Sequence, residues 1–313
     1  MIQVLEAVPN FSEGRDLTLV EALVDEIARH EVEVLDWSAD PDHHRSVVTF
    51  IGSPESVEAA ALAAARFAVE HIDLRGHRGV HPRIGALDVL PFVPLHGMTM
   101  QEAVGSARRV GAGIADLGVP VFLYGAASEP AGRGLAALRR GGFEGLLGGW
   151  QSDRTPDLLP ASGSVHPSAG GTCVGARPIL LAWNVFVSGV DPVAARAIAT
   201  EIRERDGGWR GLRALGLELV GQDRVQISMN LEDAEHASPL AVFEQIESRV
   251  HSLGGNVVET EVIGMMPDTL VLGDSADRLK LPYLGSARVL SHRVAAHVAT
   301  RRGGRTEISD RTV

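Results

Sequence analysis

Cysteine is nearly absent from this sequence of 313 residues, in which Cys173 is the only one. A single cysteine cannot form a disulfide within the chain, which excludes a disulfide-stabilised scaffold and favours a reducing compartment. No activating partner stands near it in the sequence, so we interpret Cys173 as a small core residue and not as a nucleophile. Lysine is equally scarce: Lys280 is the only one, and arginine supplies almost all of the positive charge.

An excess of positive charge is also lacking, because the formal net charge is −11 at pH 7. Non-specific binding to nucleic acid or to an anionic membrane needs a positive surface, so neither partner is expected. No apolar run is long enough to span a bilayer, and the start of the chain lacks the pattern of a secretory signal. We therefore expect a cytoplasmic protein that attracts anionic ligands through a local cluster of basic residues.

The chain does have enough apolar sequence, 45 % of its residues, for two domains of about 150 residues each. In the first half the patterns predict strands at 2–9, 33–37, 46–52, from about 84, and 120–124, with helices at 16–30, 54–71 and 99–117. In the second half they predict strands at 178–188, 214–220, 224–231 and 256–263, with helices starting at 192 and 239. The expected helix caps are Ser53, Thr99, Asp191 and Ser238, with Glu102 completing a capping box.

Both halves contain the order strand, helix, strand, strand, helix, strand. This order is typical of ferredoxin-like sandwiches, in which helices cover one face of an antiparallel sheet. The sequence therefore predicts an α+β fold of two tandem ferredoxin-like βαββαβ α/β sandwich subdomains with a cleft between them, and such clefts are preferred ligand sites. We place the N-terminal subdomain at residues 1–177, the C-terminal subdomain at 178–285 and a tail at 286–313, with the glycine-rich passage 141–171 as the connector.

The densest basic cluster outside the tail opens the run HRGVHPRIGALDVLPF at 77–92, which has two histidines and two arginines within seven residues. Histidine exchanges protons near neutral pH, and arginine binds carboxylates through two parallel hydrogen bonds. The run therefore suits acid–base chemistry on an anionic substrate, with His81 transferring the proton and Asp88 orienting an imidazole or capping the site. The alternative is that the histidines and arginines are solvated loop residues and that Asp88 is a polar group at the edge of a strand. Both interpretations stand for His81, whereas His77 is expected to be only a loop histidine.

His77 and His81 are also four residues apart, the spacing that places two zinc ligands on one face of a helix. The glycine and proline within this loop make a helix improbable, and no third ligand stands at a recognisable spacing, so we expect no metal. A metal-dependent hydrolase that adds His43 or His44 to the pair is an alternative, which elemental analysis would test.

Six parts of the sequence resemble one family. They are Val8 to Gly14 (VPNFSEG), Arg45 to Gly52, His71 to Pro94, Val119 to Gly125 (VPVFLYG), Gly175 to Arg177, and Asn184. In this order, over about residues 1–270, they resemble the glutamate formimidoyltransferase family, the formiminotransferase half of the bifunctional formimidoyltransferase-cyclodeaminase. The resemblance implies two α/β subdomains with folate in the groove between them, and a homodimer. It also implies transfer of a formimino group from N-formimino-L-glutamate to the co-substrate tetrahydrofolate, giving 5-formiminotetrahydrofolate and glutamate in histidine degradation and one-carbon metabolism.

The resemblance also implies the site. His81 falls on the catalytic histidine of the family, and one histidine with a pKa near neutral could take a proton from the attacking pterin nitrogen and return it to the leaving glutamate nitrogen. The folate-contacting segment of the family falls on about residues 160–170. The expected substrate- and folate-binding residues are Asn10, Arg45, Arg83, Asp88, Tyr124, Pro160, Val165, His166, Pro167, Ser168, Gly170, Arg177 and Asn184.

The sequence departs from the family pattern mainly on the side of the donor. Ser38 stands where the family has a loop aspartate, so Asp40 or Asp42 would have to replace that carboxylate. The other departures are His44, Ala126 and a somewhat longer segment at 160–167. The donor is therefore open between N-formimino-L-glutamate and N-formylglutamate, and a folate-binding protein without turnover is a third hypothesis.

Overall fold

The computed structural model describes residues 2–150, 154–219, 224–233, 236–268, 275–281 and 286–309. The chain divides into two compact units, Met1–Pro178 with Val294–Val313, and Ile179–Arg293. The first contains β1 (Leu5–Ala7), β2 (Asn10–Phe11), α1 (Leu17–Ala28), β3 (Glu33–Asp40), β4 (Arg45–Gly52), α2 (Pro54–His71), β5 (Leu87–Pro94), α3 (Met100–Asp116), β6 (Val121–Gly125), α4 (Leu135–Leu138), α5 (Gly142–Leu147) and β7 (Thr172–Ala176). The second contains β8 (Leu181–Ser188), α6 (Pro192–Ile202), η1 (Glu204–Asp206), β9 (Leu212–Leu219), β10 (Arg224–Leu231), α7 (Pro239–Ser252), β11 (Asn256–Ile263), α8 (Ser275–Arg278) and η4 (Ser286–Arg288), and α9 (Leu290–Ser309) follows it.

Local sequence explains where most of these helices begin. The side chains of Ser53 and Asp191 each accept a hydrogen bond from a backbone amide in the first turn of α2 and α6. Both helices have proline at the start, where its fixed φ suits a helix and its missing N–H would have no partner. The capping box of Thr99 and Glu102 at α3 is confirmed. The expectation that Ser238 caps α7 is wrong, because its side chain makes no capping hydrogen bond.

The sheet of the first unit has the order β3, β4, β1 with β2, β5, β7, β6. Because β1 and β2 form one interrupted strand between β4 and β5, the first four positions have the antiparallel order of a ferredoxin-like unit. The strands β7 and β6 extend this sheet in parallel beyond β5. The predicted connector at 141–171 is wrong, since this passage holds α5 and belongs to the first unit. Sequence patterns do not reveal β7, because it is short, fully buried and shows no alternation of polar and apolar residues.

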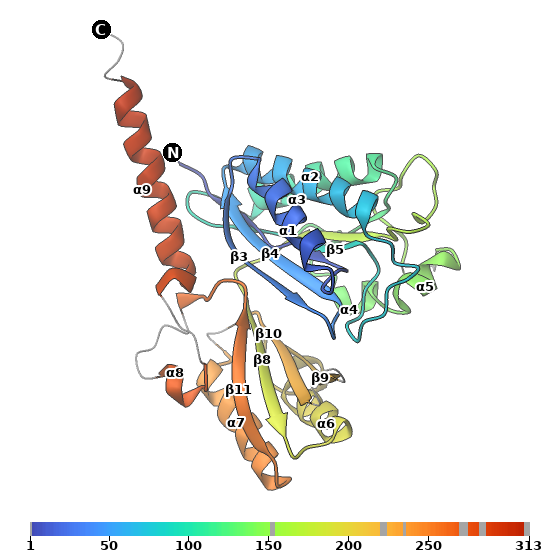
Figure 1. Ribbon diagram of the computed structural model, residues 1–313, viewed down its shortest axis with the longest axis vertical. Coiled ribbons are helices and arrows are strands. Elements are labelled where there is room, and N and C mark those ends of the chain that lie inside the picture. Colours follow the sequence, from blue (N-terminus) through green and yellow to red (C-terminus); the bar gives the residue numbers. More distant parts are fainter. Residues whose placement is uncertain are drawn as a thin grey trace. The chain divides into compact units, whose positions relative to one another are not determined.

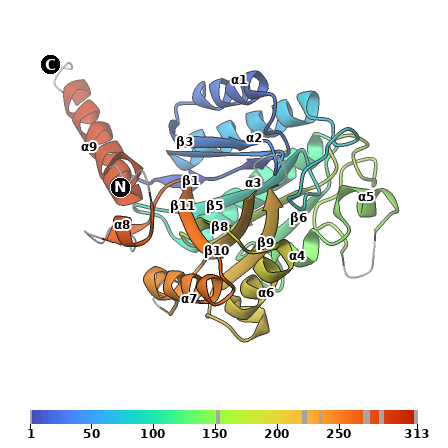
Figure 2. The same ribbon diagram turned by 60° about the horizontal axis from the view of Figure 1, so that its bottom comes forward.

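The two faces of the first sheet differ in character. Helices α1, α2 and α3 lie along one face (Figures 1 and 2), where strand side chains such as Phe50 and Phe92 pack against the alanine-rich side of α2. Side chains alternate along a strand, so Glu6, Arg45 and Tyr124 lie on the opposite face. We call the face of this sheet opposite α1–α3 the site face.

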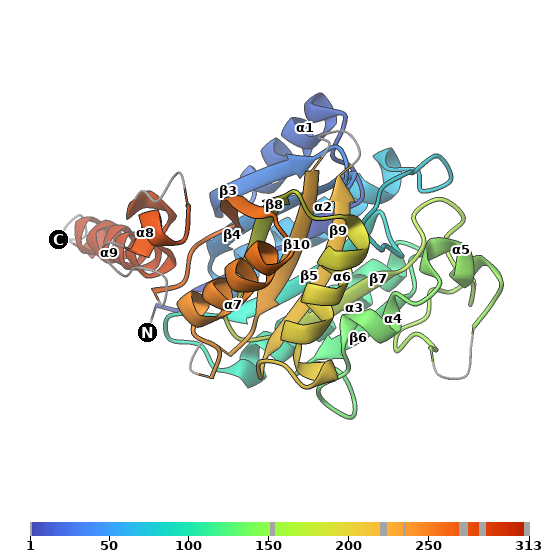
Figure 3. The same ribbon diagram turned by 90° about the horizontal axis from the view of Figure 1, so that it is seen from below.

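The second unit has the ferredoxin-like order without the extension. Its antiparallel sheet runs β11, β8, β10, β9, and α6 and α7 lie along one face (Figure 3). Trp183 and Phe243 belong to the core between this sheet and its helices, whereas Asn184 and Gln226 lie on the opposite face and are also buried. The predicted α+β class with two tandem ferredoxin-like subdomains is confirmed. Val220, the predicted end of β9, lies outside the described residues.

The C-terminal helix packs on the first unit. Val294 and Val298 of α9 join an apolar cluster with Val4 and Ile51, and His297 Nδ1 lies 2.9 Å from Glu33 Oε2. The predicted tail therefore contains a helix, which docks through apolar and polar contacts of residues 294–298. No helix in the described part of the chain is both long enough and apolar enough to cross a membrane.

Candidate active site

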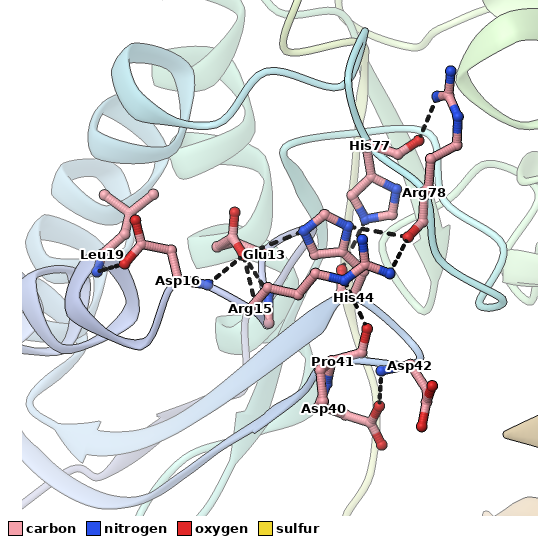
Figure 4. Close-up of polar contacts among 11 residues, drawn as sticks. Glu13, Arg15, Asp16, Leu19, Asp40, Pro41, Asp42, His44, His77 and Arg78 are labelled. Carbon is pink, nitrogen blue, oxygen red and sulfur yellow. Dashed lines mark hydrogen bonds and ion pairs between the residues drawn. The ribbon is translucent and has the colours of Figure 1, made fainter. Parts of the chain in front are cut away.

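Three loops of the first unit cross beside β4: the loop after β2, the turn between β3 and β4, and the loop before β5 (Figure 4). Glycine permits the crossing. A Cβ atom on Gly79 would lie 2.3 Å from the backbone oxygen of His43, and one on Gly14 would lie 2.5 Å from the backbone nitrogen of Arg45. Arg15 bridges the other two loops through hydrogen bonds of 2.9 and 2.7 Å to their backbone oxygens. Distant parts of the sequence are thus held together at one place.

His77 and His44 form the framework of this crossing. His77 is 3 % exposed, its Nε2 lies 2.8 Å from the backbone oxygen of His44, and the two rings stack with centroids 4.1 Å apart. His44 Nε2 in turn lies 3.2 Å from Glu13 Oε1. Burial lowers the pKa of His77 to about 4, so the ring is neutral at pH 7. The expectation that His77 is a solvated loop residue is wrong, because it is a buried structural group.

His81 lies beside Arg45. Arg45 Nη1 is 2.6 Å from His81 Nε2, and since a guanidinium only donates, Nε2 accepts and the ring proton is on Nδ1. Burial, with the positive charges of Arg45 and Arg139, holds the pKa of His81 well below its usual range. Burial also lowers the pKa of Arg45, to about 10, which leaves it charged at pH 7. His81 is therefore an uncharged base at neutral pH, and not the half-protonated group that a near-neutral pKa would give.

A β-bulge turns Asp88 onto the site face. Where β5 pairs with β2 it has one extra residue, Asp88. The carboxylate is buried, accepts a hydrogen bond from the Ile84 amide at 2.7 Å through Oδ1, and forms an ion pair with Arg139 through Oδ2. Burial opposes the charge of Arg139, yet Asp88 raises its pKa. Both carboxylate oxygens are thus engaged, Arg139 is the side-chain partner of Asp88, and no motif in the sequence marks Arg139.

A second carboxylate, that of Asp40, lies near Arg45. Asp40 Oδ1 accepts hydrogen bonds of 2.8 Å from the amides of Asp42 and His43, and these bonds shape the turn between β3 and β4. The charge of Asp40 also acts to raise the pKa of Arg45, against the larger effect of burial. Ser38 lies on the same face of β3, two residues before Asp40. Asp40 therefore lies beside Arg45. Ser38, the position at which the family resemblance implies an aspartate, supplies no carboxylate.

The segment at 160–170 is tied to the loop that carries His81. The amides of Leu74 and Ala86 donate hydrogen bonds of 2.9 Å to the backbone oxygens of Ser168 and Ala169. Gly170 has φ +71°, and a Cβ atom there would lie 2.1 Å from a backbone oxygen of the His81 loop. Within the segment Pro160 is buried, Val165, His166 and Ser168 are half-buried, and Pro167 is exposed.

The family of the chain follows from comparison with known proteins. Residues 4–177 match the N-terminal subdomain of the formiminotransferase domain, and residues 182–279 match the formiminotransferase domain. The chain belongs to the formiminotransferase family. The resemblance drawn from the sequence is confirmed, and with it the expectation that the chain is an enzyme, a transferase.

Relatives in this family cover most of the chain. A glutamate formimidoyltransferase of Streptococcus pyogenes serotype M1 is 39 % identical over 85 % of this chain and 90 % of its own length. Another, of Thermoplasma acidophilum, is 36 % identical over 94 % of this chain and 98 % of its own length. The formimidoyltransferase-cyclodeaminase of Sus scrofa is 39 % identical over 88 % of this chain, which spans 52 % of that protein.

The structure gathers only part of the residue set that the family resemblance implies. Arg45 of β4, Asp88 of β5 and Tyr124 of β6 lie on the site face, and Arg45 contacts His81 directly. Arg83 Nη2 instead lies 2.8 Å from Glu144 Oε1, so its guanidinium is already engaged. The Asn10 side chain donates to a backbone oxygen at 2.8 Å, where it shapes the break between β1 and β2. Asn184 belongs to β8 of the second unit.

Three observations concern the metal hypothesis and the role of Cys173. In the described ranges no group of three or more His, Cys, Asp or Glu side chains could hold a metal ion. The Nε2 atom of His77, a ligand that the hydrolase hypothesis needs, is engaged with a backbone oxygen. Cys173 is fully buried in an apolar cluster, and burial raises its pKa, which agrees with its interpretation as a core residue.

Proposed function

We propose that this formiminotransferase moves the formimino group of N-formimino-L-glutamate to tetrahydrofolate, giving 5-formiminotetrahydrofolate and glutamate. The observation that carries the proposal is the half-buried, uncharged His81, whose Nε2 lies 2.6 Å from Arg45 Nη1, in a chain 36–39 % identical to two proteins named glutamate formimidoyltransferase. Tetrahydrofolate is the co-substrate, and the chemistry needs no metal and no covalent enzyme intermediate. The reaction would serve histidine degradation and one-carbon metabolism.

The reaction needs one proton to leave and one to arrive. The N5 amine of the reduced pterin attacks the formimino carbon, and the C=N electron pair moves to the terminal nitrogen. His81 takes the proton from the N5 atom, which has become positively charged. It then gives a proton to the glutamate nitrogen, the C–N bond to glutamate breaks, and the C=N bond re-forms. The histidine ends the cycle uncharged, as it began.

Arg45 links substrate binding to this proton transfer. In the free protein its guanidinium engages the Nε2 lone pair that must accept the proton. The donor substrate carries carboxylates, which bind a guanidinium through two parallel hydrogen bonds. When a carboxylate of the donor substrate binds Arg45, the lone pair on His81 Nε2 becomes free. The carboxylate also compensates the positive charge beside His81, which raises the pKa of His81. The same group can then act first as base and then as acid.

The expected assembly and location belong to the same proposal. We infer a homodimer in the cytoplasm, which the family resemblance supports, and the single buried Cys173 agrees with a reducing compartment. Light scattering of the purified full-length protein measures the mass of the particle. A monomer at micromolar concentration would contradict the homodimer.

The decisive experiment is a transfer assay with two donors. Purified protein is incubated with tetrahydrofolate and either N-formimino-L-glutamate or N-formylglutamate, and the products are identified by mass spectrometry. The proposal expects transfer from the formimino donor. Transfer from the formyl donor alone would assign the alternative donor. Tetrahydrofolate binding without transfer from either donor would make the chain a folate-binding protein and overturn the enzymatic proposal.

A further inference from the structure

Glu6 is a buried carboxyl group without a partner. It is 4 % exposed, and no hydrogen bond or ion pair joins its carboxylate to another described residue. Burial raises its pKa to about 7, although the charge of Arg177 acts in the opposite direction. Burial of a carboxyl group without a hydrogen bond lowers stability, so an apolar residue would serve the fold better at this position.

Glu6 lies on the site face, far from His81 along the sheet. It pairs with Ile51 near the end of β4, whereas Arg45 begins that strand, about 20 Å away at roughly 3.3 Å per residue. The site face therefore carries two polar stations, one at His81 and one at Glu6.

Two further groups complete the Glu6 station. Arg177 follows β7, where its amide donates to the Phe92 backbone oxygen at 3.1 Å, and its charge acts on the carboxyl of Glu6 and on the phenol of Tyr124. The ring of Tyr124 lies against Gly175, because a Cβ atom on that glycine would be 2.6 Å from two ring carbons. The station thus offers a carboxylate acceptor, a guanidinium donor and an aromatic ring.

We propose that Glu6 binds the amino-pyrimidinone edge of the reduced pterin, with its carboxylate accepting the 2-amino and ring N–H donors while Arg177 donates to the ring carbonyl oxygen. This assignment rests on the proposed function for the identity of the ligand. An edge with two adjacent donors and one acceptor matches a carboxylate beside a guanidinium. A carboxylate of the donor substrate or of the folate tail does not match this edge, because it has no hydrogen to donate to the Glu6 carboxylate.

The formimino group is the other N–H donor in the reaction, and geometry assigns it elsewhere. Its carbon must lie within reach of His81 for proton transfer, and therefore at the opposite end of the site face. A pterin ring with its amino edge at Glu6 directs N5 toward His81, which leaves room for the formimino group between them. Glu6 is then a binding residue that sets the orientation of the ring.

The test is a binding measurement on the full-length protein with Glu6→Gln. Titration calorimetry uses 6-methyltetrahydropterin, its 2-desamino analogue, and p-aminobenzoyl-glutamate, which represents the folate tail. The wild type should bind the amino form about ten- to hundredfold more tightly than the desamino form, as expected for a charged hydrogen bond. Glu6→Gln should lose that preference and keep its affinity for the tail fragment. Glu21→Gln, an exposed carboxylate on α1, is the matched control and should behave as wild type.

The outcomes separate this inference from the proposed function. If Glu6→Gln binds 6-methyltetrahydropterin as tightly as the wild type, or if only the KM of N-formimino-L-glutamate rises, the assignment of Glu6 is wrong whether or not transfer occurs. If the wild type shows the predicted preference but transfers a group from neither donor, the assignment of Glu6 stands and the enzymatic proposal fails.

Discussion

The two units share one topology and differ in what their loops contain. In the first unit residues 72–86 connect the second helix to the fourth strand of the ferredoxin-like motif and carry His77 and His81. At the equivalent position of the second unit, residues 253–255 make the same connection. The longer loop can fold back over the sheet and reach the turn between β3 and β4, whereas the short one can only reverse the chain. A fold alone therefore does not determine chemistry, which depends on the loops that it carries.

Two ion pairs, one from each unit, illustrate the same contrast. The Asp88 and Arg139 side chains of the first unit are 2 and 14 % exposed, whereas the Glu259 and Arg224 side chains of the second are 41 and 43 % exposed. The buried pair exists because β7 and β6 extend the first sheet beyond β5, and α4, which follows β6, brings Arg139 to Asp88. The extension that distinguishes the first unit thus supplies charge to the candidate site.

Replacing the proposed proton-transfer residue is the strongest way to test this contrast. His81→Asn should lower kcat by about 10²- to 10⁴-fold, the range of a general acid–base group, with a smaller effect on the KM of tetrahydrofolate. His251→Asn, at the exposed end of α7 just before the short connection, is the control and should keep wild-type activity. Equal losses in the two variants, measured by steady-state transfer kinetics, would show that the long loop has no special role.

The next largest effect is expected on stability at the two ion pairs. Asp88→Asn leaves Arg139 buried without its counter-charge, which should lower the free energy of unfolding by about 3–5 kcal/mol. Glu259→Gln breaks an exposed pair and should change it by about 0–1 kcal/mol. Urea unfolding followed by circular dichroism measures both. Similar changes in the two variants would mean that the two pairs do not differ in energetic environment.

Local signals explain most of what the sequence predicts correctly. Helix caps such as Thr99 and Asp191 depend on residues three positions away, and strand alternation depends on immediate neighbours, so the helices and the ferredoxin-like strands follow from the sequence. The parts that sequence reasoning misses depend on distant contacts. Arg139 meets Asp88 from 51 residues away, and the bulge that aims Asp88 arises only when β5 pairs with β2.

Burial is the property of the candidate site that sequence reasoning handles least well. The sequence predicts that His77 is a loop histidine, but its ring stacks on that of His44, so it is a structural residue. His81 and Arg45 come from the family resemblance, but their direct contact and the lowered pKa of His81 need the three-dimensional structure. Glu6 stands in an ordinary strand pattern, and nothing in the sequence indicates that it has no partner.

The pH dependence of stability at Glu6 also tests the contrast between the two units. Its folded pKa of about 7 is above the ordinary value of 4.5, so the folded state holds a proton that the unfolded state has lost between these values. Stability should therefore fall as pH rises from about 4.5 to 7 and then level off, by about 3 kcal/mol in total. Glu6→Gln should lack this loss and be more stable than wild type above pH 7.

In the second unit, Asn184→Asp on β8 should introduce a similar loss, because Asn184 is buried on the first strand of the equivalent motif. Thermal unfolding from pH 5 to 8 measures both, and a parallel pH dependence of wild type and Glu6→Gln would contradict the assignment.

The smallest expected difference concerns glycine in the two units. Gly170 and Gly207 both have positive φ, +71° and +96°, so alanine at either position costs about 1 kcal/mol in backbone strain. Only at Gly170 would the new Cβ atom also overlap a neighbour, the Ile84 oxygen at 2.1 Å, whereas nothing lies within 4 Å at Gly207. Overlap in packed regions typically costs about 1–3 kcal/mol more, so Gly170→Ala should be destabilised by that additional amount in urea unfolding. It should also lower kcat, because the Ile84 backbone must move and Asp88 accepts a hydrogen bond from its amide. If Gly170→Ala matched Gly207→Ala in both measurements, backbone conformation alone would explain this glycine, and the close contact between the 160–170 segment and the His81 loop would not be what positions the site.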